Sequence, residues 1–230
     1  MLSAVLLEYK GITMKSETLK ILNQHKLIVR MDGFSPDLML YTAEALIKGG
    51  IKAMEVRFEG EGEAQERQCL IKLSGLKKCF GKDLAVGCGN VRTDRYVKLA
   101  VGAGADFITA PNVSKEVLER AAALNTVAIP GAFTATEIES AHRNGADMVA
   151  LLPTKFCDNY NYAHEVAKAL PHVSLVAAGD IGYNDITPLL NIGIEHYIVG
   201  GSLAGLQLAK KQEYTIITNE AKRYVDLLSK

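Results

Sequence analysis

The chain of 230 residues lacks an excess of charge of either sign, because Lys plus Arg and Asp plus Glu both number 26. A neutral surface sets up no long-range field that would attract nucleic acid or an anionic membrane. The sequence also lacks an apolar run near the roughly 18 residues that a membrane span requires. Its first residues contain no basic leader and no small-residue cleavage site. We therefore expect a cytoplasmic protein with neither nucleic acid nor a membrane as a partner.

Disulfide and metal-binding patterns are absent as well. The cysteines follow no Cys-x-x-Cys or Cys/His spacing and predict free thiols at Cys69, Cys79, Cys88 and Cys157. Cys88 stands between two glycines, but no histidine occupies an obvious partner position, so a nucleophilic role for it has little support. No cluster of His, Asp and Glu has the spacing of metal ligands. We expect no cofactor and no metal, with one alternative described below.

What the sequence does contain is a repeated unit: a short apolar run, a loop with Gly or Pro, and an amphipathic stretch. Eight such runs occur, at 27–30, 51–58, 84–87, 105–110, 126–130, 146–153, 173–179 and 194–201. Most are apolar almost throughout, which is typical of parallel strands covered on both faces. Strands that alternate with helices indicate parallel pairing through right-handed crossovers.

The stretches between the apolar runs carry helix signals. Pro36 can open one helix, and Ser114 can cap another. Thr134 and Glu137 have the spacing of a capping box.

Eight units favour a closed (β/α)8 barrel, the TIM barrel, and an open, doubly wound α/β sheet is the alternative. We find no linker or low-complexity tract and expect one domain over residues 1–230. A helix at 16–24 is expected against the barrel bottom, and a last helix is expected at 214–228.

Catalytic groups of such a barrel lie where strands end and loops begin. Glu55 and Arg57 share one face of the second apolar run, so both side chains can enter the barrel mouth. A carboxylate in this semi-enclosed place can act as a general base whose pKa is set by burial and by the neighbouring cation. The alternative interpretation is a structural ion pair at the barrel rim.

Two glycine-rich turns, AAGDIG at 177–182 and VGGSLAG at 199–205, follow the seventh and eighth runs. Backbone N–H groups of such turns can approach a phosphate, and a helix starting at Ser202 would add its N-terminal dipole. Glycines also serve tight turns, and the charge of Asp180 would repel a phosphate. The phosphate-binding candidates are Gly179, Asp180, Gly200, Gly201 and Ser202.

A third turn, GCGNVRT at 87–93, either presents Asn90 and backbone amides to a small carboxylate or is only a tight connection. In three dimensions Glu55 and Asp180 could also converge on a divalent ion. That metal site is the alternative to the metal-free expectation.

Several strand-end segments carry a family resemblance: GGIKAMEVRF, AVGCGNV, ADFITAPNVSKEVL, TVAIPGAFTATEI and VGGSL. In this order they resemble segments of the 2-keto-3-deoxy-6-phosphogluconate / 2-keto-4-hydroxyglutarate aldolase family. The resemblance covers seven of the eight strand ends, roughly from Ser16 to Tyr224. It implies a class I aldolase barrel and a homotrimer. It also implies a lyase that acts on or binds a keto acid or sugar-acid phosphate, such as 2-keto-4-hydroxyglutarate or 2-keto-3-deoxy-6-phosphogluconate.

The resemblance also implies roles for single residues. Glu55 falls on the family's catalytic glutamate, and the closing Gly-Gly-Ser falls on its phosphate-binding turn. The family's carboxylate-binding arginine corresponds to Glu59 here, and Arg57 is the candidate that replaces it from one inward position deeper. The substrate-binding residues implied in this way are Arg30, Arg57, Asn90, Pro111 and Pro130.

The sixth strand departs from the family pattern. Family members carry a Schiff-base lysine there, whereas the segment here reads GADMVALLPTK and has Ala150 at that position. Lys155, two residues after Pro153, is the candidate for a displaced Schiff-base lysine. An imine requires an amine at the keto carbon, so the usual class I mechanism does not follow from this sequence.

Two functions remain open on the sequence. The first is a lyase that acts on a small 2-keto acid, with Glu55 moving protons. The second is an isomerase or epimerase of a sugar phosphate, or a ligand-binding protein without turnover, on the same fold.

Overall fold

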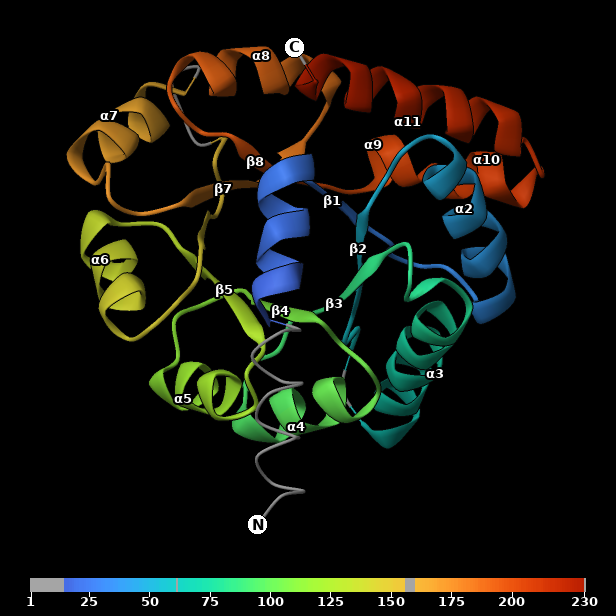
Figure 1. The fold of residues 1–230 in the computed structure, drawn as a ribbon, viewed down its shortest axis with the longest axis horizontal. Coiled ribbons are helices and arrows are strands. Elements are labelled where there is room, and N and C mark those ends of the chain that lie inside the picture. Colours follow the sequence, from blue (N-terminus) through green and yellow to red (C-terminus); the bar gives the residue numbers. More distant parts are fainter. Residues whose placement is uncertain (1–14, 61, 156–159, 230) are drawn as a thin grey trace.

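The computed structural model describes residues 15–60, 62–155 and 160–229, which form a closed parallel barrel surrounded by helices (Figure 1). Its strands are β1 (Leu27–Arg30), β2 (Ala53–Arg57), β3 (Ala85–Gly89), β4 (Phe107–Ala110), β5 (Val127–Ala132), β6 (Val149–Leu151), β7 (Leu175–Ile181) and β8 (His196–Val199). Each strand pairs with the next along the chain, and β1 also pairs with β8. The prediction of a (β/α)8 barrel is confirmed, and the doubly wound alternative is wrong.

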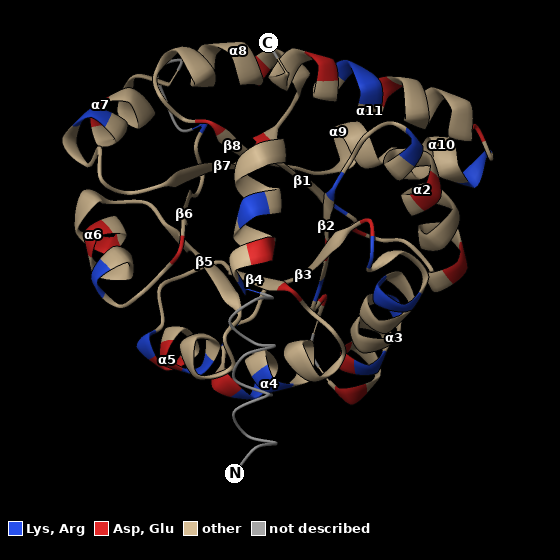
Figure 2. Cartoon of the chain, in the orientation of Figure 1, with Lys and Arg blue, Asp and Glu red and all other residues tan. Residues whose placement is uncertain are grey.

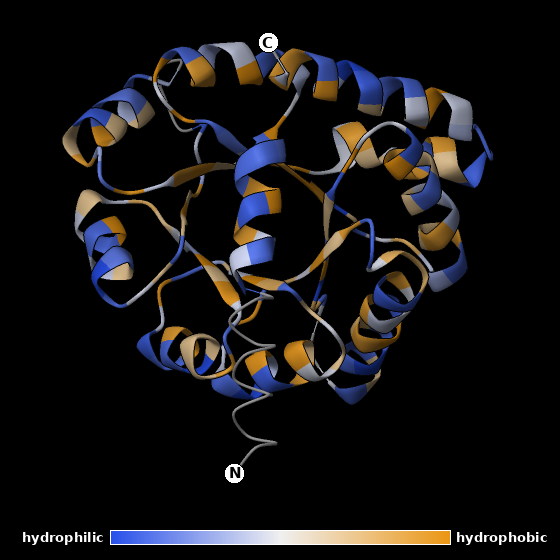
Figure 3. Ribbon diagram, in the orientation of Figure 1, coloured by the Kyte–Doolittle hydropathy of each residue, from blue (hydrophilic) through white to orange (hydrophobic). Residues whose placement is uncertain are grey.

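A ring of helices covers the outer face of the barrel. These are α2 (Pro36–Lys48), α3 (Glu63–Phe80), α4 (Asp94–Gly102), α5 (Lys115–Ala123), α6 (Ala135–Arg143), α7 (Asn161–Ala169), α8 (Tyr183–Asn191), α9 (Gly201–Ala204), α10 (Leu206–Lys210) and α11 (Tyr214–Leu228). Figure 2 shows their charged residues mainly around the outside of the ring, and Figure 3 shows the strands as predominantly hydrophobic. None of the helices in the described part of the chain is both long and apolar enough to span a membrane.

The helix starts follow the signals in the sequence. Pro36 is the first residue of α2, and the Ser114 hydroxyl accepts a hydrogen bond from the Val117 N–H at the start of α5. Thr134 and Glu137 form a reciprocal capping box at α6. The caps at α5 and α6 satisfy N–H groups that have no partner within their own helix, and Pro36 has no N–H to satisfy.

The barrel interior is a separate apolar cluster from the strand–helix interface. Alternate residues of each strand point inward, so Ala53 belongs to the interior cluster while Met54 and Val56 pack against helices. The interior is tightly filled: a Cβ on Gly87 would lie 2.1 Å from the Phe107 ring. Glycine at this point of β3 is therefore a packing requirement.

A helix over residues 15–25 crosses the amino-terminal end of the barrel, in front of the strands in Figure 1. Its Leu19, Ile21 and Leu22 side chains pack against the interior cluster. The prediction of a helix against the barrel bottom is confirmed. With that end covered, the carboxyl-terminal ends of the strands remain as the place for a site.

Candidate active site

The carboxyl group of Glu55 lies inside the barrel. Glu55 is on β2, is 2% exposed, and its Cα pairs with that of Arg30 on β1. The Thr109 hydroxyl on β4 donates a hydrogen bond to Glu55 Oε2 at 2.8 Å. The alternation along β2 places Glu55 and Arg57 on the same inward face, as the sequence predicts.

Burial dominates the electrostatics of Glu55. It raises the pKa of the carboxyl above its usual value, because the charged form loses its hydration. The Thr109 hydrogen bond and the charges of Arg57 and Arg30 act in the opposite direction, and Asp32 adds to the rise. A carboxyl with a raised pKa keeps its proton to higher pH than an ordinary glutamate, and such a group can donate a proton as well as accept one.

Glycine on the neighbouring strand provides the space for these groups. A Cβ on Gly89 would lie 2.6 Å from Arg57 Cγ and 3.1 Å from both Glu55 Oε1 and Thr109 Oγ1. Any larger residue at this position of β3 would therefore displace the three side chains.

The two arginines share one carboxylate. Arg30 Nε donates to Asp32 Oδ2 at 2.6 Å, and Arg57 Nη1 lies 3.7 Å from Asp32 Oδ1. The Arg30 guanidinium also lies against β8, since a Cβ on Gly200 would be 2.9 Å from its Nη2. Arg30 therefore connects the Glu55 region to the glycine turn after β8. Asp32 was not singled out from the sequence, although it follows Arg30 by two residues.

The last residues of β7, where the sequence predicts a turn after the strand, belong to the strand itself and lie beside the turn that follows β8. The Ser202 hydroxyl donates to the Ile181 carbonyl at 3.5 Å. Gly179 and Asp180 both have positive φ, at 93° and 53°, within a register shift of β7 against β8. Asp180 is exposed and forms no ion pair within the described residues. The α9 helix that begins at Gly201 has only four residues, so the dipole expected from a helix at Ser202 is small.

Ala150 faces the barrel interior. It is 3% exposed, belongs to the interior cluster, and pairs with Gly131 on β5 and Val176 on β7. Its methyl group therefore occupies an inward position of β6 where a longer side chain would reach into the barrel.

Lys155 is held away from the barrel interior by an acid on α8. Its Nζ lies 3.0 Å from Asp185 Oδ2, and the Tyr160 hydroxyl donates to the other oxygen of Asp185. Asp185 also accepts the N–H of Gly182 at 2.7 Å. In this arrangement the Lys155 amine is an ion-pair partner and is not directed at Ala150.

Three further predicted binding residues contribute little to the Glu55 region. Asn90 has φ of 60°, and its Nδ2 donates to the Phe58 carbonyl at 2.7 Å, as in a tight connection. Pro111 is exposed in the loop after β4. Pro130 alternates with the inward-facing Ile129, so its ring points towards the helices.

Cys88 does not face the barrel mouth. It lies in the strand–helix interface, with its Sγ 3.8 Å from Cys69 Sγ on α3. The hydrogen bond between the two thiols and then burial raise the pKa of Cys88, so a nucleophilic role at the mouth is not supported. In the described part of the chain no group of three or more His, Cys, Asp and Glu could hold a metal ion.

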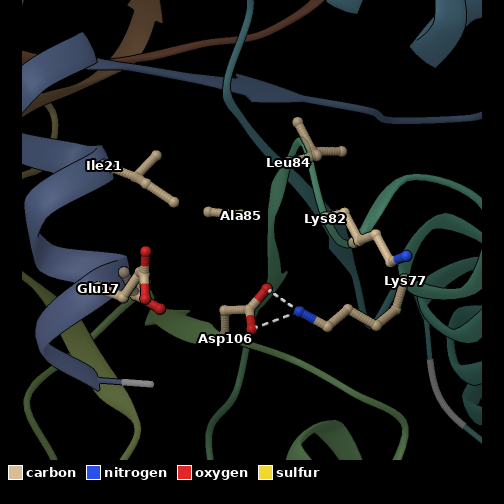
Figure 4. Close-up of a pocket in the computed structure, with 9 residues that line it drawn as sticks. Glu17, Ile21, Lys77, Lys82, Leu84, Ala85 and Asp106 are labelled. Atoms are coloured by element: carbon tan, nitrogen blue, oxygen red, sulfur yellow. Dashed lines mark hydrogen bonds and ion pairs between the residues drawn. The ribbon is translucent and has the colours of Figure 1, made fainter. Parts of the chain in front are cut away.

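A cavity of about 350 Å³ lies at the opposite end of the barrel, beside the helix of residues 15–25 (Figure 4). Lys77 Nζ contacts both carboxylate oxygens of Asp106 there, at 2.6 and 2.7 Å. Asp106 also accepts the N–H of Val86 at 2.9 Å. These charges stabilise the ends of α3, β3 and β4, and they are distant in sequence and in the fold from the Glu55 region.

The raised pKa of Glu55 predicts how stability depends on pH. The unfolded chain loses this proton near pH 4.3, about the usual glutamate value, and the folded protein keeps it to higher pH. The stabilisation is therefore fully present below that pH and is lost as pH rises through the raised pKa. Urea unfolding of wild type and Glu55→Gln between about pH 4 and pH 8 should show the wild type losing stability relative to the variant. Parallel curves would contradict the raised pKa.

Comparison with known proteins identifies a family and several relatives that this chain resembles. The KDPG and KHG aldolase family matches residues 20–220. Over 144 residues the chain is 31% identical to a 2-dehydro-3-deoxy-phosphogluconate aldolase of Treponema pallidum, covering 63% of this chain and 65% of that protein. Over 178 residues it is 24% identical to a 2-dehydro-3-deoxy-6-phosphogalactonate aldolase of Escherichia coli, covering 77% and 83%. A structure of native KDPGal superposes with a TM-score of 0.75 at 25% identity, covering 87% of this chain and 92% of that one. Because the family match extends over most of the chain, this protein belongs to the KDPG and KHG aldolase family.

Proposed function

We propose that the protein binds a small 2-keto acid at the carboxyl-terminal end of the barrel and that Glu55 moves protons at the carbon next to its keto group. The observation that carries the proposal is the buried carboxyl of Glu55. Its pKa is raised, it accepts a hydrogen bond from Thr109, and two arginines lie beside it. Arg30 and Arg57 are the groups that would hold the carboxylate and keto oxygen of the ligand. The relatives are carbon–carbon lyases, and this proton transfer is a part of their reaction class.

The step that Glu55 would perform is the exchange of a proton between carbon and carboxylate. In the ionised state it accepts a proton from the carbon next to the keto group, and in the neutral state it returns one to the same carbon. The electron pair released on carbon needs stabilisation at the keto oxygen, and the guanidinium groups supply positive charge for it. An imine would serve the same purpose better, but it requires an amine inside the barrel.

We infer that Ala150 occupies the position of the family's Schiff-base lysine, which leaves the usual imine step without its amine. Lys155, the displaced candidate, is paired with Asp185 and would have to leave that carboxylate to reach a keto carbon. Proton transfer without carbon–carbon cleavage, as in an isomerase or epimerase, is therefore the second candidate function. A homotrimer, implied by the family resemblance, remains a proposal.

Exchange of the methyl protons of pyruvate for deuterium tests the proposed function directly. In D2O the wild type should accelerate this exchange, and Glu55→Gln should lose about 10²- to 10⁴-fold of the acceleration, as is usual when a general base is removed. Proton NMR of the methyl signal follows the reaction. Glu66→Gln, at a carboxylate paired with Arg95 on the outer helices, is the matched control and should exchange like wild type. Equal rates for wild type and Glu55→Gln would refute the role of Glu55.

Trapping with borohydride tests the missing imine. Reduction captures only an imine, and the interior offers no amine at Ala150, so pyruvate should leave no adduct on the wild-type protein. Ala150→Lys should gain a single pyruvate adduct in intact-mass spectra. A prompt adduct on wild type that maps to Lys155 would instead establish the displaced-lysine route.

The two glycine-rich segments at 177–182 and 199–205 should bind phosphate weakly because of Asp180. The backbone donors at Gly179, Gly200 and Gly201 do not depend on side-chain charge, whereas Asp180 is exposed and unpaired among the described residues. One negative charge at about 4–8 Å from a dianion, after screening, is enough to weaken binding about tenfold. Calorimetric titration of a phosphorylated keto acid should therefore show tighter binding to Asp180→Gly.

The matched variant for this titration is Asp180→Asn, which removes the charge and still tolerates the positive φ of 53°. If the gain arises from charge, both variants should bind more tightly than wild type. If only Asp180→Gly binds more tightly, the gain in affinity comes from backbone freedom and not from the loss of charge. Equal affinities of wild type and both variants would contradict the repulsion by Asp180. Tighter binding only with a divalent ion present would support the metal alternative.

A further inference from the structure

A second cavity lies beside Arg57, between the amino-terminal ends of α2 and α3. Its volume is about 360 Å³, within the range of small-molecule sites. The apolar part of its wall includes Phe34 and Cys69, each 2% exposed. Gln65 and Gln68 of α3 line its polar part. The cavity shares Arg57 with the barrel mouth, yet its other walls belong to helices outside the barrel.

Two cations line this cavity without a hydrogen-bond partner. Lys72 of α3 is 9% exposed, and its Nζ lies 3.7 Å from Glu59 Oε2. Arg57 Nη1 is likewise 3.7 Å from its nearest acid, Asp32. Within the described residues, neither cation donates a hydrogen bond to the protein. Cationic side chains that are largely buried normally have such partners, and Lys72 is buried in this way. The Arg57 side chain is 32% exposed, so water can reach its donors. Both cations therefore retain donors for a ligand.

The charge of the cavity fits a single carboxylate. The charged residues of its wall are Arg57, Lys72 and Glu59, which leave one net positive charge. Glu59 is oriented by the Gly33 N–H, which donates to its Oε1 at 3.0 Å. One carboxylate neutralises this wall, whereas a phosphate dianion would make it negative.

We propose that the cavity is a carboxylate-binding subsite in which one carboxylate accepts hydrogen bonds from both Arg57 and Lys72. The carboxylate has two possible sources. It is either a second acid group on the ligand whose keto group lies near Glu55, or a separate small organic acid. Only the first source rests on the proposed function, because the second requires no ligand in the barrel.

Calorimetric titration of acetate, pyruvate and 2-oxoglutarate into the intact protein tests the subsite. Lys72→Met keeps the length of the side chain and removes its charge, and affinity at the subsite should fall about tenfold. Lys72→Arg should retain most of the affinity, because it keeps the charge. Lys78→Met, at an exposed lysine of the same helix, is the matched control and should bind like wild type.

A variant that is expected to tighten carboxylate binding controls for a general structural effect of the substitutions. Glu59→Gln removes the acid that competes for Lys72 while its amide oxygen can still accept from Gly33. Carboxylate binding should therefore become several-fold tighter, which damage to the fold would not produce.

The pattern of losses distinguishes the two sources. A loss on Lys72→Met for 2-oxoglutarate but not for pyruvate identifies a second acid group of one ligand. Acetate that binds wild type together with pyruvate, and weakens on Lys72→Met, identifies a separate acid. If pyruvate fails to bind wild type, the proposed function fails, and the acetate titration still decides on the subsite. The subsite would be overturned if wild type and Lys72→Met bound both acetate and 2-oxoglutarate with equal affinity, or if neither of these two acids bound saturably.

Discussion

The burial of one carboxyl group inside an otherwise apolar barrel is the constraint on which the site depends. Around Glu55 the interior is filled by apolar side chains, so its charge can be balanced only from the open end of the barrel. Arg30 and Arg57 lie at that end, and Gly89 leaves the space in which Thr109 reaches the carboxyl. The strand register that sets Arg30 beside Glu55 is therefore a chemical requirement as well as a structural one.

Much of the fold could be predicted because its signals are local. Near-continuous apolar runs mark strands covered on both faces, and Pro36 and the Thr134 capping box mark helix starts that the structure confirms. The end of β7 could not be predicted in the same way. Its register shifts at Gly179 and Asp180, where positive φ values let the chain turn and then resume pairing at Ile181. An apolar run does not reveal such a bulge.

The site could be predicted only where strand alternation decides the direction of a side chain. Glu55 and Arg57 share a face of β2 by simple parity, and the structure has both pointing inward. Loop side chains obey no such rule. Asn90 turns to the Phe58 carbonyl, and Lys155 pairs with Asp185, which is 30 residues away along the chain. The link that Asp32 makes between the two arginines depends in the same way on loop geometry.

The residue at position 150 also bears on the pKa of Glu55. A lysine at this inward position would bring an ammonium group into the interior that contains Glu55, and an opposite charge nearby lowers the pKa of a carboxyl. With alanine there, Glu55 depends on two arginines that are already shared with Asp32, and burial raises its pKa. The carboxyl is thus shifted towards the neutral acid, which can donate a proton to a ligand. Ala150→Lys would therefore be expected to lower the pKa of Glu55, because it would place a positive charge in the same interior.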